Sequence, residues 1–402
     1  MQTNLSPSWD LLSVMLYVFL GYVGACAIKK SKRKSYVLFR RRGNRIYADL
    51  PYLLWWCSWT FVAAFRLVNK NGLGGTDAYA YVNFFKICNG SAFEDSALVL
   101  QYAEHYEILY KLLNKVIRLF TGNHQVLFLL VYGFIVWTYQ KVIRCFSYGN
   151  IYAAPFIALF FVYLRSFNTL RTELSAAFIL LMTLSLYKDK YRSAILLGIM
   201  AIGIQITSAL YCLLIPFHYW CRKGKLNTYK VIIMVALSSL TGKAAQILMT
   251  GSIGRALGHQ YFSYAGHNIG HSFFENFWKI AFGQLLIGLL ILAFDRKLKR
   301  KMSENGEFAA SLQFVREVCL FDVITIPITF ILDIWRGYEY LYIMRLLMWS
   351  YVTCVFLKGK KSDVRHVVCA VEVVMFTAWL VFRIVKTWEQ SGYMPYMLSV
   401  FQ

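Results

Sequence analysis

The sequence predicts an all-α, polytopic integral membrane protein with about twelve transmembrane or half-membrane helices. Its 402 residues are 58% hydrophobic, and the mean hydropathy is +0.48. Only 16% of the residues are charged, against about 25% in a typical soluble domain. Apolar runs of about 20 residues, the length of a helix that crosses a bilayer, recur along the whole chain. The runs are continuous and lack the alternation of transmembrane strands.

Ten of these runs are expected to form ordinary spans in one transmembrane domain, 1–402. They lie near 9–27, 49–68, 125–143, 150–165, 172–187, 229–248, 277–294, 312–333, 339–357 and 366–387. The stretch 193–220 has a basic cluster at both ends, so we expect a hairpin of two short helices that meet near Gln205–Ser208. One long tilted helix is the alternative.

The formal net charge of +23 is gathered in short clusters between the apolar runs, which argues for membrane topology rather than nucleic-acid binding. The clusters are 29–45, 188–192, 221–225, 295–301 and 358–365. By the positive-inside rule they mark the cytoplasmic face. Both termini and the loops 69–124 and 249–276 are then outside.

Neither a disulfide framework nor a metal or other cofactor is expected. The nine cysteines lie almost all in apolar runs or beside basic clusters. His267 and His271 are four residues apart, but a glycine separates them and no third ligand follows at helical spacing. No nucleotide-binding loop is present either.

Arginines at the outer ends of the predicted spans are the first candidate site residues. An arginine near membrane depth costs about 2.5–3.5 kcal/mol on insertion scales. Snorkelling to the headgroups explains a single one. A cluster on the face that normally sheds positive charge instead indicates an anionic ligand, and the planar guanidinium fork suits a diphosphate. The arginines are Arg66, Arg165, Arg171 and Arg336.

Two acids in the first outer loop are candidates for a general base. Asp77 follows two glycines that permit a tight turn, and helix N-capping is the alternative explanation for it. Glu107 lies in the amphipathic stretch 101–120, which is expected to form a helix in the membrane interface.

These segments resemble the Wzy-like, EpsG-like polysaccharide polymerases of O-antigen, capsule or exopolysaccharide synthesis. "FRLVNKNGLGGTDAYAY" is similar to the family's FR…GTD…Y motif. "YEILYKLLN" is similar to its E-P-G-aromatic-x-L-N segment, with Ile108 and Leu109 in place of Pro-Gly. "FNTLRTELSA" resembles its N-x-x-R-Q-x-x-A segment, with Thr172 in place of Gln. The histidine of its H-x-S-A-L segment is missing near Gln205.

The resemblance implies an enzyme that joins undecaprenyl-diphosphate-linked oligosaccharides at the outer face of the bacterial cytoplasmic membrane. Asp77 or Glu107 would remove a proton from the attacking sugar hydroxyl, and the four arginines would hold the diphosphate. Sugar contacts are expected from Tyr81, Asn168 and Tyr338. A flippase and a chain-length regulator of the same pathway are the implied protein partners. Nucleic acid is not one.

Two other functions remain open at this point. A membrane glycosyltransferase that adds a single sugar from a polyprenyl-phosphate donor would also need an acid in the first outer loop. A transporter of lipid-linked sugars is expected to show two similar halves, and the sequence has no internal repeat.

Overall fold

The computed structural model describes residues 7–30, 36–41, 44–71, 73–88, 106–146, 153–223, 228–250, 281–304, 306–332, 337–391 and 396–398. The chain forms two compact units. The first contains Met1–Ala177 and Phe356–Gln402, and the second contains Phe178–Val355.

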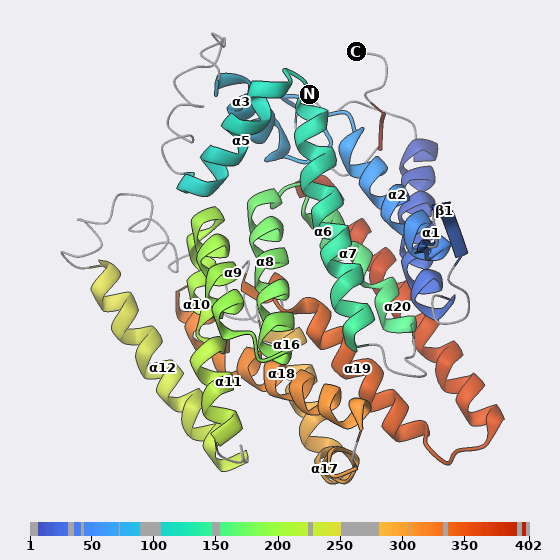
Figure 1. Ribbon diagram of the computed structural model, residues 1–402, viewed down its shortest axis with the longest axis vertical. Helices are drawn as coiled ribbons and strands as arrows, with labels where there is room; N and C mark the ends of the chain where they lie inside the picture. The colour runs from blue at the N-terminus through green and yellow to red at the C-terminus, as the bar shows by residue number, and fades with distance from the viewer. Residues whose placement is uncertain are drawn as a thin grey trace. The chain divides into compact units, whose positions relative to one another are not determined.

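The first unit is built from helices of very different length (Figure 1). They are α1 (Pro7–Lys30), α2 (Leu50–Ala64), α3 (Ala78–Ile87), α5 (Ile108–Phe120), α6 (His124–Phe146), the 3₁₀ turn η1 (Ala154–Ile157), α7 (Leu159–Arg165), the first part of α8 (Leu170–Tyr187), and α20 (Ser362–Ser391). By length and composition, α1, α6, α8 and α20 can cross a membrane. The expected spans 49–68 and 150–165 are shorter, because α2 has 15 residues and α7 only 7. The total of about twelve spans therefore stays a prediction.

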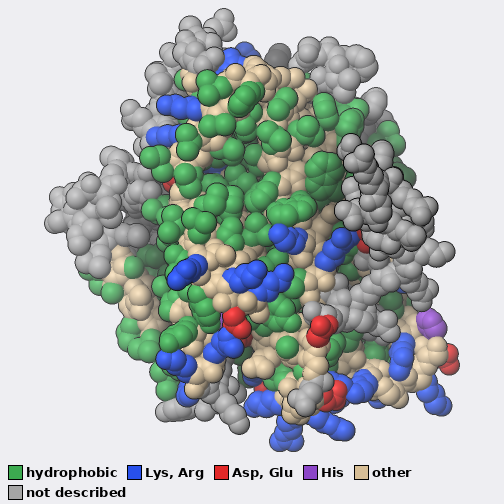
Figure 2. Space-filling view, in the orientation of Figure 1, with side chains coloured by type: hydrophobic (Ala, Val, Ile, Leu, Met, Phe, Trp, Pro, Cys, Tyr) green, Lys and Arg blue, Asp and Glu red, His purple; other side chains and the backbone are tan. Residues whose placement is uncertain are grey.

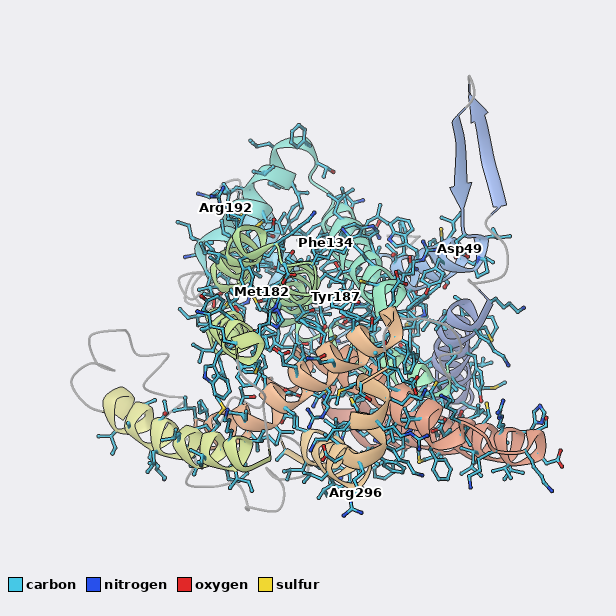
Figure 3. All side chains as sticks on the ribbon, turned by 60° about the horizontal axis from the view of Figure 1, so that its bottom comes forward. Asp49, Phe134, Met182, Tyr187, Arg192 and Arg296 are labelled. Carbon is cyan, nitrogen blue, oxygen red and sulfur yellow. The ribbon has the colours of Figure 1, made fainter. Side chains whose placement is uncertain are left out.

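One hairpin departs from the all-helical expectation. Strands β1 (Tyr36–Arg41) and β2 (Asn44–Ala48) pair antiparallel; β1 lies within the basic cluster 29–45 and β2 begins at its end. The hairpin extends away from α1 and α2, with Asp49 at its base (Figure 3). Short runs of aromatic and β-branched residues on either side of a glycine favour this structure.

Helix α2 contacts both α1 and α6 (Figure 1). Buried tryptophan and tyrosine rings pack in the interior beside it. Trp59 donates from Nε1 to the Leu20 carbonyl at 2.9 Å, and the Tyr163 hydroxyl donates to the Trp59 carbonyl at 2.5 Å. Both rings are fully buried. Buried donors that find backbone acceptors fix the helices against one another.

The two ends of α2 are held differently. At its start, Asp49 accepts a bond from Arg144 of α6 at 2.8 Å. Beyond its end, the Leu67 amide donates to the Met397 carbonyl at 2.7 Å. The chain from Arg66 onward thus begins at the end of α2 opposite the hairpin, and this is the end that carries the candidate site residues.

The second unit is organised around α18 (Glu307–Ile331), which contacts α11 (Leu214–Lys223), α12 (Thr228–Thr250), α16 (Phe282–Ala293) and α17 (Asp295–Met302). Its remaining elements are α9 (Tyr191–Ile204), η2 (Ile206–Ser208), α10 (Ala209–Cys212), η5 (Gly337–Glu339) and α19 (Tyr342–Leu357). Lys and Arg side chains gather over α17 on the face drawn in Figure 2.

The stretch 193–220 is interrupted at Gln205, whose backbone is extended between α9 and η2. Arg222, near the end of α11, bonds to Asp189, just before α9. The two ends of this stretch therefore lie together, as a hairpin requires. Most of the outer loop 249–276 lies outside the described residues.

Candidate active site

Two glycines shape the turn that follows α2. Gly74 and Gly75 have φ angles of +79° and +124°, which side-chain-bearing residues rarely adopt. A Cβ on Gly75 would lie 2.7 Å from Oδ1 of Asn168 and 2.8 Å from the Phe167 carbonyl oxygen. One on Gly74 would overlap the Leu67 carbonyl. The glycines thus let the turn after α2 pack directly on the turn between α7 and α8.

Asn168 joins the two turns. Its Oδ1 accepts a hydrogen bond from the Asp77 amide at 3.3 Å, and its carbonyl accepts one from the Tyr81 hydroxyl at 3.2 Å. Three residues that the sequence singled out, Asp77, Tyr81 and Asn168, are therefore neighbours although about 90 positions separate the segments.

Asp77 occupies the N-cap position of α3, yet its side chain makes no capping hydrogen bond. The carboxylate is half-buried. N-capping requires an acceptor bond to the first turn of the helix. Asp77 thus begins α3 without a side-chain capping hydrogen bond.

Arg66 is buried beneath the same turn, with 1% of its surface exposed. It donates from Nε to the Gly74 carbonyl at 2.7 Å, from Nη2 to the Tyr132 hydroxyl at 3.0 Å, and from Nη1 to the Ala63 carbonyl. The guanidinium carbon lies 4.1 Å from the centre of the Phe167 ring. All three guanidinium nitrogens of Arg66 therefore donate to oxygen atoms of the protein itself.

Tyr132 extends this support to the second turn, because its hydroxyl donates to the Ser166 carbonyl at 3.0 Å. Arg66 and Tyr132 thus form a buried chain of hydrogen bonds from the glycine turn to the α7–α8 turn. Sequence reasoning missed Tyr132, which lies in the middle of an apolar helix and has no local signal.

Glu107 and Arg171 form an ion pair with 2.6 Å between Oε2 and Nη1. Both side chains keep some exposure, 14% for Glu107 and 15% for Arg171. The Arg171 guanidinium lies 4.3 Å from the centre of the Tyr106 ring. Its Nε is buried and has no hydrogen-bond partner within the described part of the chain. The pair therefore places a buried guanidinium N–H without a hydrogen-bond partner among the described residues beside a carboxylate.

An aromatic cluster surrounds this pair. Tyr106 and Tyr110 have ring centres 5.4 Å apart, Phe84 lies 4.6 Å from Tyr106, and Tyr81 lies 6.1 Å from Tyr110. Sequence reasoning had not chosen Tyr106 or Phe84, whose spacing reads as ordinary packing. These three ring pairs meet edge to face. Aromatic rings beside polar groups are suited to the apolar faces of a sugar.

Tyr110 and Asn114, one turn apart on α5, are fully buried. The Tyr110 hydroxyl and the Asn114 Oδ1 have no hydrogen-bond partner within the described segments. Burial raises the pKa of Tyr110 well above its usual range, so the hydroxyl stays protonated and can act only as a neutral donor or acceptor.

The structure describes the remaining predicted site residues only in part. Arg165 is half-buried at the end of α7, and its carbonyl accepts the Asn168 amide at 2.9 Å. Arg336 lies outside the described residues, as do His267 and His271. Tyr338 belongs to η5 of the second unit, and its side chain is not among those described.

The model of the EpsG family matches residues 52–398. The chain belongs to the EpsG family. No curated protein and no solved structure matches it. The matched region includes both turns and the Glu107–Arg171 pair, and the resemblance drawn from the motifs is confirmed. Membership in the EpsG family, together with the long apolar helices, points to a membrane enzyme of polysaccharide biosynthesis.

Proposed function

We propose that this EpsG-family protein polymerises undecaprenyl-diphosphate-linked oligosaccharide repeat units at the outer face of the bacterial cytoplasmic membrane. The observation that carries the proposal is the Glu107–Arg171 pair among Tyr81, Tyr106 and Tyr110. The reaction requires an acid to accept a hydroxyl proton, a guanidinium to bind the diphosphate, and aromatic rings to contact the sugar, and this group of residues combines all three.

In the proposed reaction, a sugar hydroxyl of one lipid-linked unit attacks the anomeric carbon of another. A new C–O bond forms, and the bond from that carbon to the diphosphate oxygen breaks, so undecaprenyl diphosphate leaves with the electron pair. The hydroxyl proton passes to a carboxylate. The charge that develops on the diphosphate is neutralised by arginine, so the step needs no metal.

Substrate binding would open the Glu107–Arg171 pair. Diphosphate oxygens compete with the Glu107 carboxylate for the guanidinium, since Arg171 has one buried donor atom without a hydrogen-bond partner. As Arg171 turns to the diphosphate, the Glu107 carboxylate leaves the ion pair and can accept the hydroxyl proton. Binding and base activation are then coupled.

Asp77 is the second candidate for the base. The Asn168 bond holds its amide, and its side chain makes no capping bond to α3. Arg165 is proposed as a further diphosphate ligand, and Tyr81 and Asn168 as sugar contacts. Arg66 has three protein acceptors, so we assign it the positioning of the glycine turn.

The test uses purified protein in proteoliposomes with a lipid-linked repeat unit as the substrate. Polymerisation gives a ladder of products, whereas a glycosyltransferase that adds one sugar gives a single new band. Arg171→Lys keeps the charge but loses the fork, and it should lose much of the ladder. Arg144→Lys is the matched control, because Arg144 forms a 2.8 Å ion pair with Asp49 at the other end of α2.

A single added sugar from the unmodified protein would reject polymerisation. A full ladder from Arg171→Ala would remove this arginine from the site.

A further inference from the structure

Helix α5 presents an exposed apolar face. Its first three residues lie four positions apart, and the last two follow three and four positions after the third, so all five share one side of the helix. The exposed fractions are 75% for Ile108, 53% for Leu112, 44% for Val116, 77% for Leu119 and 85% for Phe120. We call these five residues the α5 stripe. On the opposite side, Tyr110, Asn114 and Ile117 are buried against the protein.

The α5 stripe does not belong to a membrane span. The helix has 13 residues, whereas a span needs about 20. Only residues 121–123 separate α5 from α6, and α5 runs at an angle to that long helix (Figure 1). Water contact with five large apolar side chains on one helix is unfavourable, so the stripe requires a cover.

Cations line one edge of the stripe. On a helical projection, Lys111, Lys115 and Arg118 lie together between the apolar face and the buried face. No acid lies between Ile108 and Phe120. A short helix with an apolar face and a basic edge is suited to the boundary between acyl chains and anionic headgroups.

The start of α5 is the site residue Glu107. It occupies the N-cap position, and its carbonyl accepts the Lys111 amide at 3.1 Å. Any surface that sets the depth of α5 therefore sets the depth of the Glu107 carboxylate and of its partner Arg171.

We propose that the α5 stripe inserts into the outer leaflet of an anionic bilayer, with the basic edge at the headgroup phosphates. This docking holds the Glu107–Arg171 pair at headgroup level. That is the level of a diphosphate attached to a lipid, and this last consequence rests on the proposed function.

Depth measurements test the docking without requiring turnover. Single cysteines replace Leu112 or Leu119 in a cysteine-free background and carry a fluorescent label, in vesicles of phosphatidylcholine and phosphatidylglycerol. We expect brominated lipids to quench both labels and aqueous iodide to reach neither. Leu130, 54% exposed on α6, is the lipid-facing control, and Asn123, exposed at the α5–α6 junction, is the aqueous control.

Iodide quenching at positions 112 and 119 as strong as at position 123 would overturn the proposal. Efficient crosslinking between copies through either cysteine would overturn it too, because a second copy would then be the cover. If depth is the same in pure phosphatidylcholine, the assignment of the basic edge to anionic headgroups is wrong.

The consequence for the site has its own test. The double variant Leu112→Ser, Leu119→Ser should lose bromine quenching of a label at position 116 and also lose product. If the double variant loses quenching but still makes product, the coupling between docking and Glu107 is rejected. The proposal that the unmodified protein docks would stand. If the unmodified protein docks but makes no polymer, the proposed function fails and the docking stands.

Discussion

Gly75→Ala tests the contact between the two turns that hold the candidate site. The added Cβ would lie 2.7 Å from Asn168 Oδ1. An ordinary carbon–oxygen contact is about 3.4 Å, so the Asn168 side chain must retreat by about 0.7 Å (3.4 − 2.7). The Phe167 carbonyl oxygen, 2.8 Å from the same Cβ position, adds a second overlap.

Gly75→Ala should destabilise the fold through backbone strain and through steric overlap, and the variant Gly306→Ala distinguishes the two effects. The φ of +124° is strained for alanine, which costs about 1–3 kcal/mol. The steric overlap adds about 1–3 kcal/mol, as overpacking does. Gly306 has a φ of +140° and nothing within 4 Å of its Cβ position, so Gly306→Ala carries the strain alone.

The assay compares melting temperature and product formation for both variants in the same membrane preparation. A misplacement approaching 1 Å near the reacting groups costs up to about 10²-fold in rate. Gly75→Ala should therefore melt lower than Gly306→Ala and lose at least about tenfold in activity per folded molecule. Equal melting temperatures together with full activity in Gly75→Ala would refute the close packing of the two turns.

Further predictions concern the acids, the buried arginine and the topology. One of the variants Asp77→Asn and Glu107→Gln removes the base, and the rate of that variant should fall about 10²–10⁴-fold. It should melt normally and still bind lipid-linked substrate. Wild-type rates in both variants would exclude a carboxylate base from this loop. Arg66→Gln should lower the free energy of unfolding by about 1.5–3 kcal/mol for each charged hydrogen bond lost, measured by thermal melting, and an unchanged melting temperature would contradict its positioning assignment. Cysteines replacing Asp95 or Ser263 should react with an impermeant label from outside, and cysteines replacing Lys32 or Lys299 only from inside; outside labelling at position 223 would refute a hairpin at 193–220 with both ends in the cytoplasm.

The sequence by itself determined the class of protein and the segments that matter. Continuous apolar runs require a lipid-like environment, and this requirement does not depend on how the runs pack. The glycine turn at 74–75, the break at Gln205 and the family motifs are local patterns, so they are visible without a fold. The β-hairpin 36–48 also follows from a local pattern, the aromatic and β-branched residues on either side of a glycine.

Only the tertiary structure decided the burial and the contacts of each candidate residue. Arg66 and Arg171 look alike in the sequence, but the Arg66 guanidinium is buried among protein acceptors, whereas Arg171 pairs with Glu107 and keeps 15% of its side chain exposed. Tyr106, Tyr132 and Phe84 acquire their significance from contacts across distant segments. Burial and hydrogen-bond partners arise from the packing of chain segments far apart in sequence, and no local pattern encodes them.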